Sequence, residues 1–220
     1  MTSEKIYIYD AIVFDFDGTL VDSCNIKTWA FGKLFESYGK AIVQDFLAYH
    51  LQYEGVSRFV KFRYLKETLL GKTYKTEDGN KLSQLYSKLV RDAVVQAPFL
   101  PFVLEFLEEV YQQIPLFVAS GTPEAELRDI VVLRGMNRFF RGIYGSPDSK
   151  AKILQKVLRV NKLIPETVLM VGDALSDLEG SQIAGTGFVG ILNGKSTPFT
   201  KSTPTVQNFN ELKRLLKWKI

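Results

Sequence analysis

The stretch IVFDFDGTLVDS, residues 12–23, decides the predicted fold of this 220-residue chain. It begins within a β-branched and aromatic run, 11–14, which predicts a fully buried strand. Asp15 and Asp17 follow two positions apart, and a glycine comes next. Two carboxylates this close repel each other, so one stays protonated or a cation binds between them. The stretch therefore favours a nucleophile, an acid/base and a magnesium ion together. The alternative is an acid cluster that caps a turn or binds calcium.

The pattern after residue 97 alternates between strands and helices. Strands are predicted at 116–119, 142–144, 168–171 and 188–192, and helices at 101–112, 149–160, 176–183 and 208–216, with one more that starts at Pro123. Strands that alternate with helices imply a parallel sheet with right-handed crossovers. We therefore expect an α/β fold, a doubly wound parallel sheet with a Rossmann-like core, made of residues 1–21 and 97–220.

Residues 22–96 show only helical spacing and predict an inserted α-helical cap subdomain directly after the first strand. One apolar stripe falls at 26, 30, 34 and 38, and another at 82, 85, 89 and 93. The aromatic residues of this insert, including Trp29 and Phe31, sit at helical spacing and predict a packed cap core. Cys24 is predicted to be a packed or hinge residue with no redox role.

Polar residues follow three further strands, and ligands of open α/β sheets bind at the carboxyl ends of strands. In LFVASGTP, 116–123, Ser120, Gly121 and Thr122 lie where a strand gives way to a helix. Backbone N–H groups at a helix start, with a hydroxyl, form an anion cradle. The alternative is that Ser120 and Thr122 serve only as helix caps.

Lys150, in GSPDSKAKIL, and the acids of VLMVGDALSD, 168–177, complete the set. A cation at a helix start opposes the helix dipole, so a bound anion explains Lys150 better than chance exposure does. Lys152 is the competing lysine, but it points about 200° away around the helix. Asp173 ends a strand and Asp177 lies one helical turn further on, so both can face the same site. The alternative for Asp177 is an ordinary acid in a first helical turn.

Composition excludes several other classes. The chain has 28 Lys and Arg against 24 Asp and Glu, which gives a net charge of +4. The basic residues are scattered along the sequence, and this argues against a surface that binds nucleic acid. One cysteine and one histidine, His50, rule out a zinc site that needs two histidines, and a Ser-His-Asp site would have to use His50. The lone cysteine favours a reducing compartment, and no signal peptide or membrane span is visible, so we expect a cytoplasmic protein.

The order and the sequences of these segments resemble the motifs of the haloacid dehalogenase-like hydrolase superfamily. DFDGTLVDS, ASGT and VGDALSD carry the resemblance, while the lysine segment is less distinctive. The resemblance implies that a first aspartate attacks phosphorus, that a second protonates the leaving oxygen and then activates water, and that Mg²⁺ is held among carboxylates. In this sequence the resemblance assigns the nucleophile to Asp15 and the acid/base to Asp17. It assigns Mg²⁺ binding to the Asp15 carboxylate, the Asp17 backbone carbonyl and Asp173, with support from Asp177. It assigns phosphoryl binding to Ser120, Gly121 and Lys150.

The acid at position 17 narrows the class that the resemblance implies. Dehalogenases of this superfamily lack an acid there and ATPase pumps carry a threonine, so a phosphatase or phosphomutase remains. The sequence looks most like the phosphoglycolate phosphatase and β-phosphoglucomutase branch of the superfamily. We expect a Mg²⁺-dependent phosphatase that acts on a small phosphorylated metabolite through an aspartyl-phosphate, as a monomer or weak homo-oligomer with no nucleic-acid or membrane partner. The alternatives are a phosphomutase and a non-catalytic protein that binds a phosphate ligand.

Similar caps carry a loop with glycine and arginine that closes over the substrate, and Gly55-Val56-Ser57-Arg58 matches it here. Arg58 is expected to pair with a carboxylate or second phosphate of the substrate, because a guanidinium binds such groups in a bidentate manner. The alternative is that the basic residues form the solvated face of a helix over 56–70. Lys61, Arg63 and His50 remain open as further substrate contacts.

Overall fold

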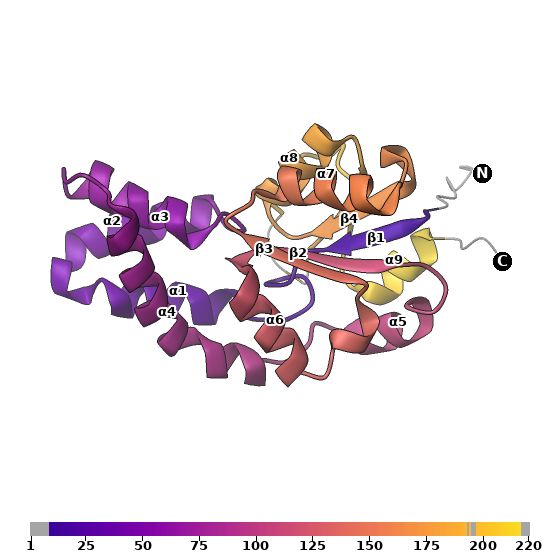
Figure 1. The fold of residues 1–220 in the computed structure, drawn as a ribbon, viewed down its shortest axis with the longest axis horizontal. Helices are drawn as coiled ribbons and strands as arrows, with labels where there is room; N and C mark the ends of the chain where they lie inside the picture. Colours follow the sequence, from indigo (N-terminus) through magenta and orange to yellow (C-terminus); the bar gives the residue numbers. More distant parts are fainter. Residues whose placement is uncertain (1–8, 193, 195–196, 217–220) are drawn as a thin grey trace.

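A six-stranded parallel sheet forms the centre of the molecule, in the order β3-β2-β1-β4-β5-β6. The computed structural model describes residues 9–192, 194 and 197–216, so the ends of the predicted core, 1–8 and 217–220, lie outside the described residues. The strands are β1 (Ala11–Phe14), β2 (Leu116–Pro123), β3 (Gly142–Ser146), β4 (Val168–Gly172), β5 (Gly187–Ile191) and β6 (Thr205–Val206). The chain crosses from one side of β1 to the other, and this confirms the predicted doubly wound sheet (Figure 1).

Helices cover both faces of the sheet (Figure 1). On one face lie α5 (Val103–Val110), α6 (Glu124–Leu133) and α9 (Phe209–Leu215), and on the other α7 (Lys150–Asn161) and α8 (Leu175–Ala184). Short 3₁₀ turns occur at Asn137–Phe139 and Pro165–Thr167. Phe14 of β1 packs against Phe106 of α5, with ring centroids 6.1 Å apart, while Val13 shares a cluster with Ile153 of α7. Because both faces are covered, β1 is apolar at every position.

A separate helical lobe lies beyond the end of β1, at the left of Figure 1. It contains α1 (Cys24–Leu34), α2 (Lys40–Gln52), α3 (Arg58–Tyr64) and α4 (Thr76–Gln96), with a 3₁₀ turn at Glu36–Tyr38 and a π-helical turn at Leu65–Leu69. Its interior is aromatic: Phe31 stacks on Tyr86 with centroids 4.2 Å apart, and Phe35, Phe46 and Phe62 surround them. We call this lobe the cap and the remainder the core.

The two connections between cap and core are hydrogen-bonded to each other. The Leu100 N–H donates to the Leu20 carbonyl at 3.2 Å, and the Asp22 N–H donates to the Pro98 carbonyl at 3.0 Å. The chain therefore leaves and re-enters the core side by side, close to the predicted boundaries at 21 and 97. Within the described part of the chain, none of the helices combines the length and apolar character that crossing a membrane requires.

Several predicted boundaries in the core are wrong. The second strand continues to Pro123, so Ser120 and Thr122 lie in an extended segment, and Pro123 precedes α6 instead of forming its first turn. The helix predicted from 101 begins at Val103, because Phe102 has a left-handed backbone with φ of 66°. The short strand β6 was not predicted, since two residues give no periodicity.

The predicted cap core is also partly wrong. Trp29 is 58% exposed and Leu85 is 50% exposed, although both were predicted to pack inside. On α4 the buried side chains fall at 83, 86, 90 and 94, one residue later than the predicted stripe. The reason is that Tyr86, which stacks on Phe31 and donates to the Lys27 carbonyl at 3.1 Å, sets which face of α4 turns inward.

Candidate active site

The loop after β1 brings Asp15 to the centre of the strand ends. Asp15 continues the parallel pairing, because its N–H donates to the Val171 carbonyl of β4 at 2.8 Å. The carboxylate of Asp15 is buried. The turn that follows needs Gly18, whose φ is 84° and where a Cβ would lie 2.1 Å from Asp173 Oδ2. The glycine of the motif thus lets the first loop approach the loop after β4.

Lys150 joins the first and fourth segments. Its Nζ donates to Asp15 Oδ1 at 2.5 Å and to Asp177 Oδ1 at 2.6 Å, and all three side chains are buried. Lys152 is exposed, as the 200° difference in helical direction predicts. Gly180 of α8 permits this approach, because a Cβ there would lie 2.7 Å from Lys150 Cβ. The structure therefore places Lys150, and not Lys152, at the strand ends.

The pKa values of Asp15 and Lys150, which form a buried ion pair, are shifted for different reasons. Burial raises the pKa of the Asp15 carboxyl to about 7, and the nearby charges of Asp177 and Asp17 add to this while Lys150 opposes it. For Lys150, the charges of Asp15 and Asp177 outweigh the effect of burial and raise the pKa of its ammonium. Lys150 therefore stays protonated, and a further cation beside Asp15 would favour its ionised, nucleophilic form at neutral pH.

Asp17 lies in a different environment from Asp15. Its carboxylate accepts hydrogen bonds from Ser23 Oγ at 2.7 Å and Thr122 Oγ1 at 3.1 Å, and from the Lys27 ammonium. Ser120 Oγ lies 3.4 Å away. Burial opposes ionisation, but the charge and hydrogen bond of Lys27, together with the two hydroxyls, lower the pKa of Asp17 below its usual range.

Lys27 is a site residue that the sequence did not predict. It comes from α1 of the cap, and its ammonium also contacts Thr122 Oγ1 of the core at 2.8 Å. Lys27 follows Ser23 by four residues, so the two lie on the same face of the helix start. That spacing, next to the second aspartate of the motif, is the signal that could have indicated it.

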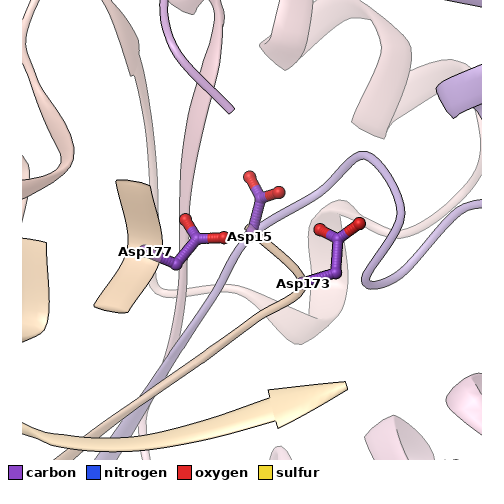
Figure 2. A group of neighbouring side chains, drawn as sticks. All are labelled: Asp15, Asp173 and Asp177. Carbon is purple, nitrogen blue, oxygen red and sulfur yellow. The ribbon is translucent and has the colours of Figure 1, made fainter. Parts of the chain in front are cut away.

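Three carboxylates could hold a metal ion: one oxygen from each of Asp15, Asp173 and Asp177 lies within 4.8 Å of the others (Figure 2). Carboxylate oxygens without nitrogen or sulfur ligands suit a hard cation such as Mg²⁺. In Figure 2 the Asp177 carboxylate points toward Asp15, and its oxygens accept from Lys150 and from the Ala174 N–H at 3.1 Å. Both oxygens of Asp177 are thus engaged, and a supporting role for Asp177, with Asp15 and Asp173 as the metal ligands, stays a prediction. Coordination by the Asp17 backbone carbonyl stays a prediction.

The segment Ser120–Thr122 meets the cap at this site. Ser120 is buried, and its Oγ accepts the Thr122 N–H at 3.1 Å. A Cβ on Gly121 would lie 2.5 Å from the Gly55 carbonyl oxygen, so the core cradle and the cap loop are in direct contact. The predicted anion cradle and the predicted substrate loop therefore line one space.

That space is a cavity of about 50 Å³ between cap and core. The core contributes Asp15, Asp17, Ser120 and Asp173, and the cap contributes basic and aromatic side chains. We call it the active-site cavity. A volume of this size admits on the order of three to five water-sized groups, so the cavity fits a small ligand in this arrangement of the two lobes.

The structure separates the predicted cap contacts. Arg58 lines the active-site cavity, but its guanidinium is paired in a bidentate manner with Glu126 of α6, at 2.8 and 2.9 Å. Lys61 and His50 also line the cavity. Arg63 is not among the cavity residues and lies over the Tyr74 ring, 5.2 Å from its centroid. A role for Arg58 in binding substrate stays a prediction, and Glu126 was not foreseen.

A family model of haloacid dehalogenase-like hydrolases matches residues 12–191, which spans the segments described above. The chain therefore belongs to the haloacid dehalogenase-like hydrolase family.

Known relatives agree with this assignment. The chain is 25% identical to a phosphorylated carbohydrates phosphatase from Thermotoga maritima, over 80% of this chain and 82% of the relative. It is 26% identical to a phosphoglycolate phosphatase from Aquifex aeolicus, over 88% and 92%. Its fold matches a haloacid dehalogenase-like hydrolase from Streptococcus pneumoniae with a TM-score of 0.69 and 22% identity, over 94% of this chain and 98% of that one. It is a hydrolase of this family, and these relatives with a stated activity are phosphatases.

Proposed function

We propose that this protein is a Mg²⁺-dependent phosphatase that hydrolyses a small phosphorylated metabolite of the cytoplasm through an aspartyl-phosphate on Asp15. The observation that carries the proposal is the pair of aspartates after β1. Asp15 is buried beside Lys150 and the carboxylate cluster, while Asp17 is partly buried and is bound by hydroxyls and by Lys27. Two carboxyl groups in such different surroundings suit two different roles, a nucleophile and an acid/base.

In the first step an Asp15 carboxylate oxygen attacks phosphorus, and the bond from phosphorus to the ester oxygen breaks. The leaving oxygen takes a proton from Asp17. Lys150, Ser120 and the Gly121 backbone hold the phosphoryl oxygens and stabilise their developing charge. Asp17 is ionised while it pairs with Lys27, so this step requires Asp17 to give up that contact and take a proton from water before it protonates the leaving oxygen.

In the second step water attacks the phosphorus of the aspartyl-phosphate. Asp17 accepts a proton from that water, the bond between phosphorus and Asp15 breaks, and inorganic phosphate leaves. The lowered pKa of Asp17 favours the ionised state that this step uses. Asp15, Asp173 and the Asp17 carbonyl, supported by Asp177, would hold Mg²⁺, which would supply positive charge that draws an anionic substrate into an acidic site.

The substrate class follows from the cavity and the relatives. A cavity of about 50 Å³ favours a compact leaving group over a polymer. Relatives named for phosphorylated carbohydrates and for phosphoglycolate support a phospho-sugar or phospho-acid. We expect the protein to act as a monomer or weak homo-oligomer with no nucleic-acid partner.

Phosphate release from a panel of sugar phosphates, phosphoglycolate and nucleotides tests the proposal. We expect turnover with Mg²⁺, none after EDTA, and recovery when Mg²⁺ is restored. Lys150→Ala should lose activity and the matched variant Lys152→Ala should keep it. Full activity in metal-free buffer, or a larger loss in Lys152→Ala, would overturn the proposal. Isomerisation of a sugar phosphate without phosphate release would favour a phosphomutase instead.

A further inference from the structure

One cation of the active-site cavity forms no salt bridge with an acid of the described residues. Lys61, on α3, is 3% exposed, and its Nζ contacts His50 Nδ1 at 2.8 Å. Its ammonium lies 5.7 Å from the centroid of the Phe31 ring. Among the described residues no carboxylate forms a salt bridge with it; Glu54, which also lines the cavity, is near enough to act on its charge but not to pair.

His50 serves Lys61 as a neutral acceptor. The ammonium has only protons to offer, so His50 Nδ1 accepts, and Nε2 carries the proton and donates to Thr28 Oγ1 at 3.1 Å. Thr28 in turn donates to the Cys24 carbonyl at 3.0 Å. Burial, with the charges of Lys61 and Lys27, lowers the pKa of His50 to about 3, so the ring stays neutral. The chain of hydrogen bonds fixes Lys61 without neutralising it.

The other cap cations of the cavity are already paired. Arg58 forms two bonds with Glu126, and Lys27 pairs with Asp17. Lys61 uses one of its three donors on His50, and the structure shows no further acceptor for it among the described residues. It is therefore the cap cation best able to take an anion without first breaking an ion pair.

A buried ammonium without a counter-ion costs several kcal/mol of desolvation. Burial is also the main reason that the pKa of Lys61 falls to about 7, and a bound anion would restore the charged form. A methionine or leucine would fill the same space beside Phe31 without this penalty. A lysine at position 61 is therefore better explained by a bound anion than by packing within the cap.

We propose that Lys61, held by His50, binds a second anionic group on the leaving part of the substrate, a carboxylate or a phosphate. The inference rests on the proposed phosphatase function and narrows its substrate to phosphate monoesters that carry a second negative charge. The phosphoryl group would lie on the core side, against Ser120 and Lys150, and the second anion on the cap side, against Lys61. Ser120 and Lys61 both line the active-site cavity, and Lys150 lines an adjoining pocket that Ser120 also lines.

Three probes separate the sources of the anion. Hydroxyethyl phosphate has a neutral end, phosphoglycolate has a carboxylate in its place, and ethylene glycol bisphosphate has a phosphate. In Lys61→Met we expect kcat/KM to fall roughly 10- to 100-fold for the anionic probe that the wild type prefers, since a charge-assisted contact is lost. Hydroxyethyl phosphate should change by less than about threefold. Lys61→Arg should recover part of the loss.

Arg63→Met is the matched control, because it removes a cation from the same helix but outside the cavity, and it should leave all three probes unchanged. Equal losses on all probes in Lys61→Met would make Lys61 a structural residue of the cap, and no loss would exclude it from binding. Calorimetric binding of the probes to Asp15→Asn, with and without Lys61→Met, gives the same comparison without turnover. If the wild type releases no phosphate, the proposed function fails, while this binding comparison still decides the anion site.

Discussion

Replacing Lys27 by methionine removes the charge by which the cap pairs with Asp17, the second aspartate of the site. Lys27 and Asp17 are 17% and 13% exposed at the side chain, so water screens their attraction only weakly. Charge-assisted hydrogen bonds of this kind contribute about 1.5–3 kcal/mol. The Ser23 and Thr122 hydroxyls still bind Asp17 in the variant and recover part of that energy. We therefore expect a coupling energy of roughly 2 kcal/mol between Lys27 and Asp17.

A double-mutant cycle measures this coupling. The free energy of unfolding in urea at pH 7 is determined for the wild type, Lys27→Met, Asp17→Asn and the double variant. The matched control is Lys33→Met with Glu36→Gln, an ion pair between the end of the same helix and the 3₁₀ turn that follows it. Its side chains are half-exposed or more, and we expect a coupling of less than about 0.5 kcal/mol. A Lys27–Asp17 coupling energy no larger than that of the control pair would refute the inference that this contact holds the cap against Asp17.

Three further outcomes follow from contacts in the cap and at its edge. Glu126→Gln leaves the buried Arg58 guanidinium without its counter-charge, so the free energy of unfolding should fall by about 3 kcal/mol, and a loss below about 1 kcal/mol would contradict the buried pair. The pKa of His50 is lowered to about 3 in the folded protein, below its ordinary value of about 6.5. Between these two pH values the His50 ring is protonated in the unfolded chain but not in the folded one. The free energy of unfolding of the wild type should therefore fall by about 2 kcal/mol through this group between pH 7 and 5. His50→Gln should lack that part of the loss in parallel urea titrations, whereas identical pH dependences would exclude the titration. Gly121→Ala puts a Cβ against the Gly55 carbonyl, so kcat/KM should fall at least about tenfold while the core stays folded by circular dichroism; unchanged kinetics would show that cap and cradle need not touch.

Sequence patterns predicted the core well because its strands are buried on both faces. The run at β1 is apolar throughout and ends at two acids, so both the element and its position at the strand ends could be predicted. Asp15, Lys150 and Asp177 come from separate segments, yet the structure brings them together. That convergence is a property of parallel sheets, whose carboxyl ends share one edge.

Contacts between lobes could not be predicted in the same way. Lys27 meets Thr122 across 95 positions of sequence, and Arg58 meets Glu126 across 68. Neither pair lies on one element, so periodicity carries no information about it. Trp29 was misplaced for a related reason, since helical spacing gives the existence of an apolar face but not which residues the neighbouring helices cover.

The most direct test of the proposed chemistry is to trap the covalent intermediate. Protein mixed with a good phosphate monoester and Mg²⁺ is quenched in acid within the first turnovers, digested, and searched by mass spectrometry for a phosphorylated aspartate. We expect the phosphoryl group on Asp15, its absence in EDTA, and neither label nor turnover in Asp15→Asn. Phosphate release by Asp15→Asn within roughly tenfold of the wild-type rate would rule out Asp15 as the nucleophile.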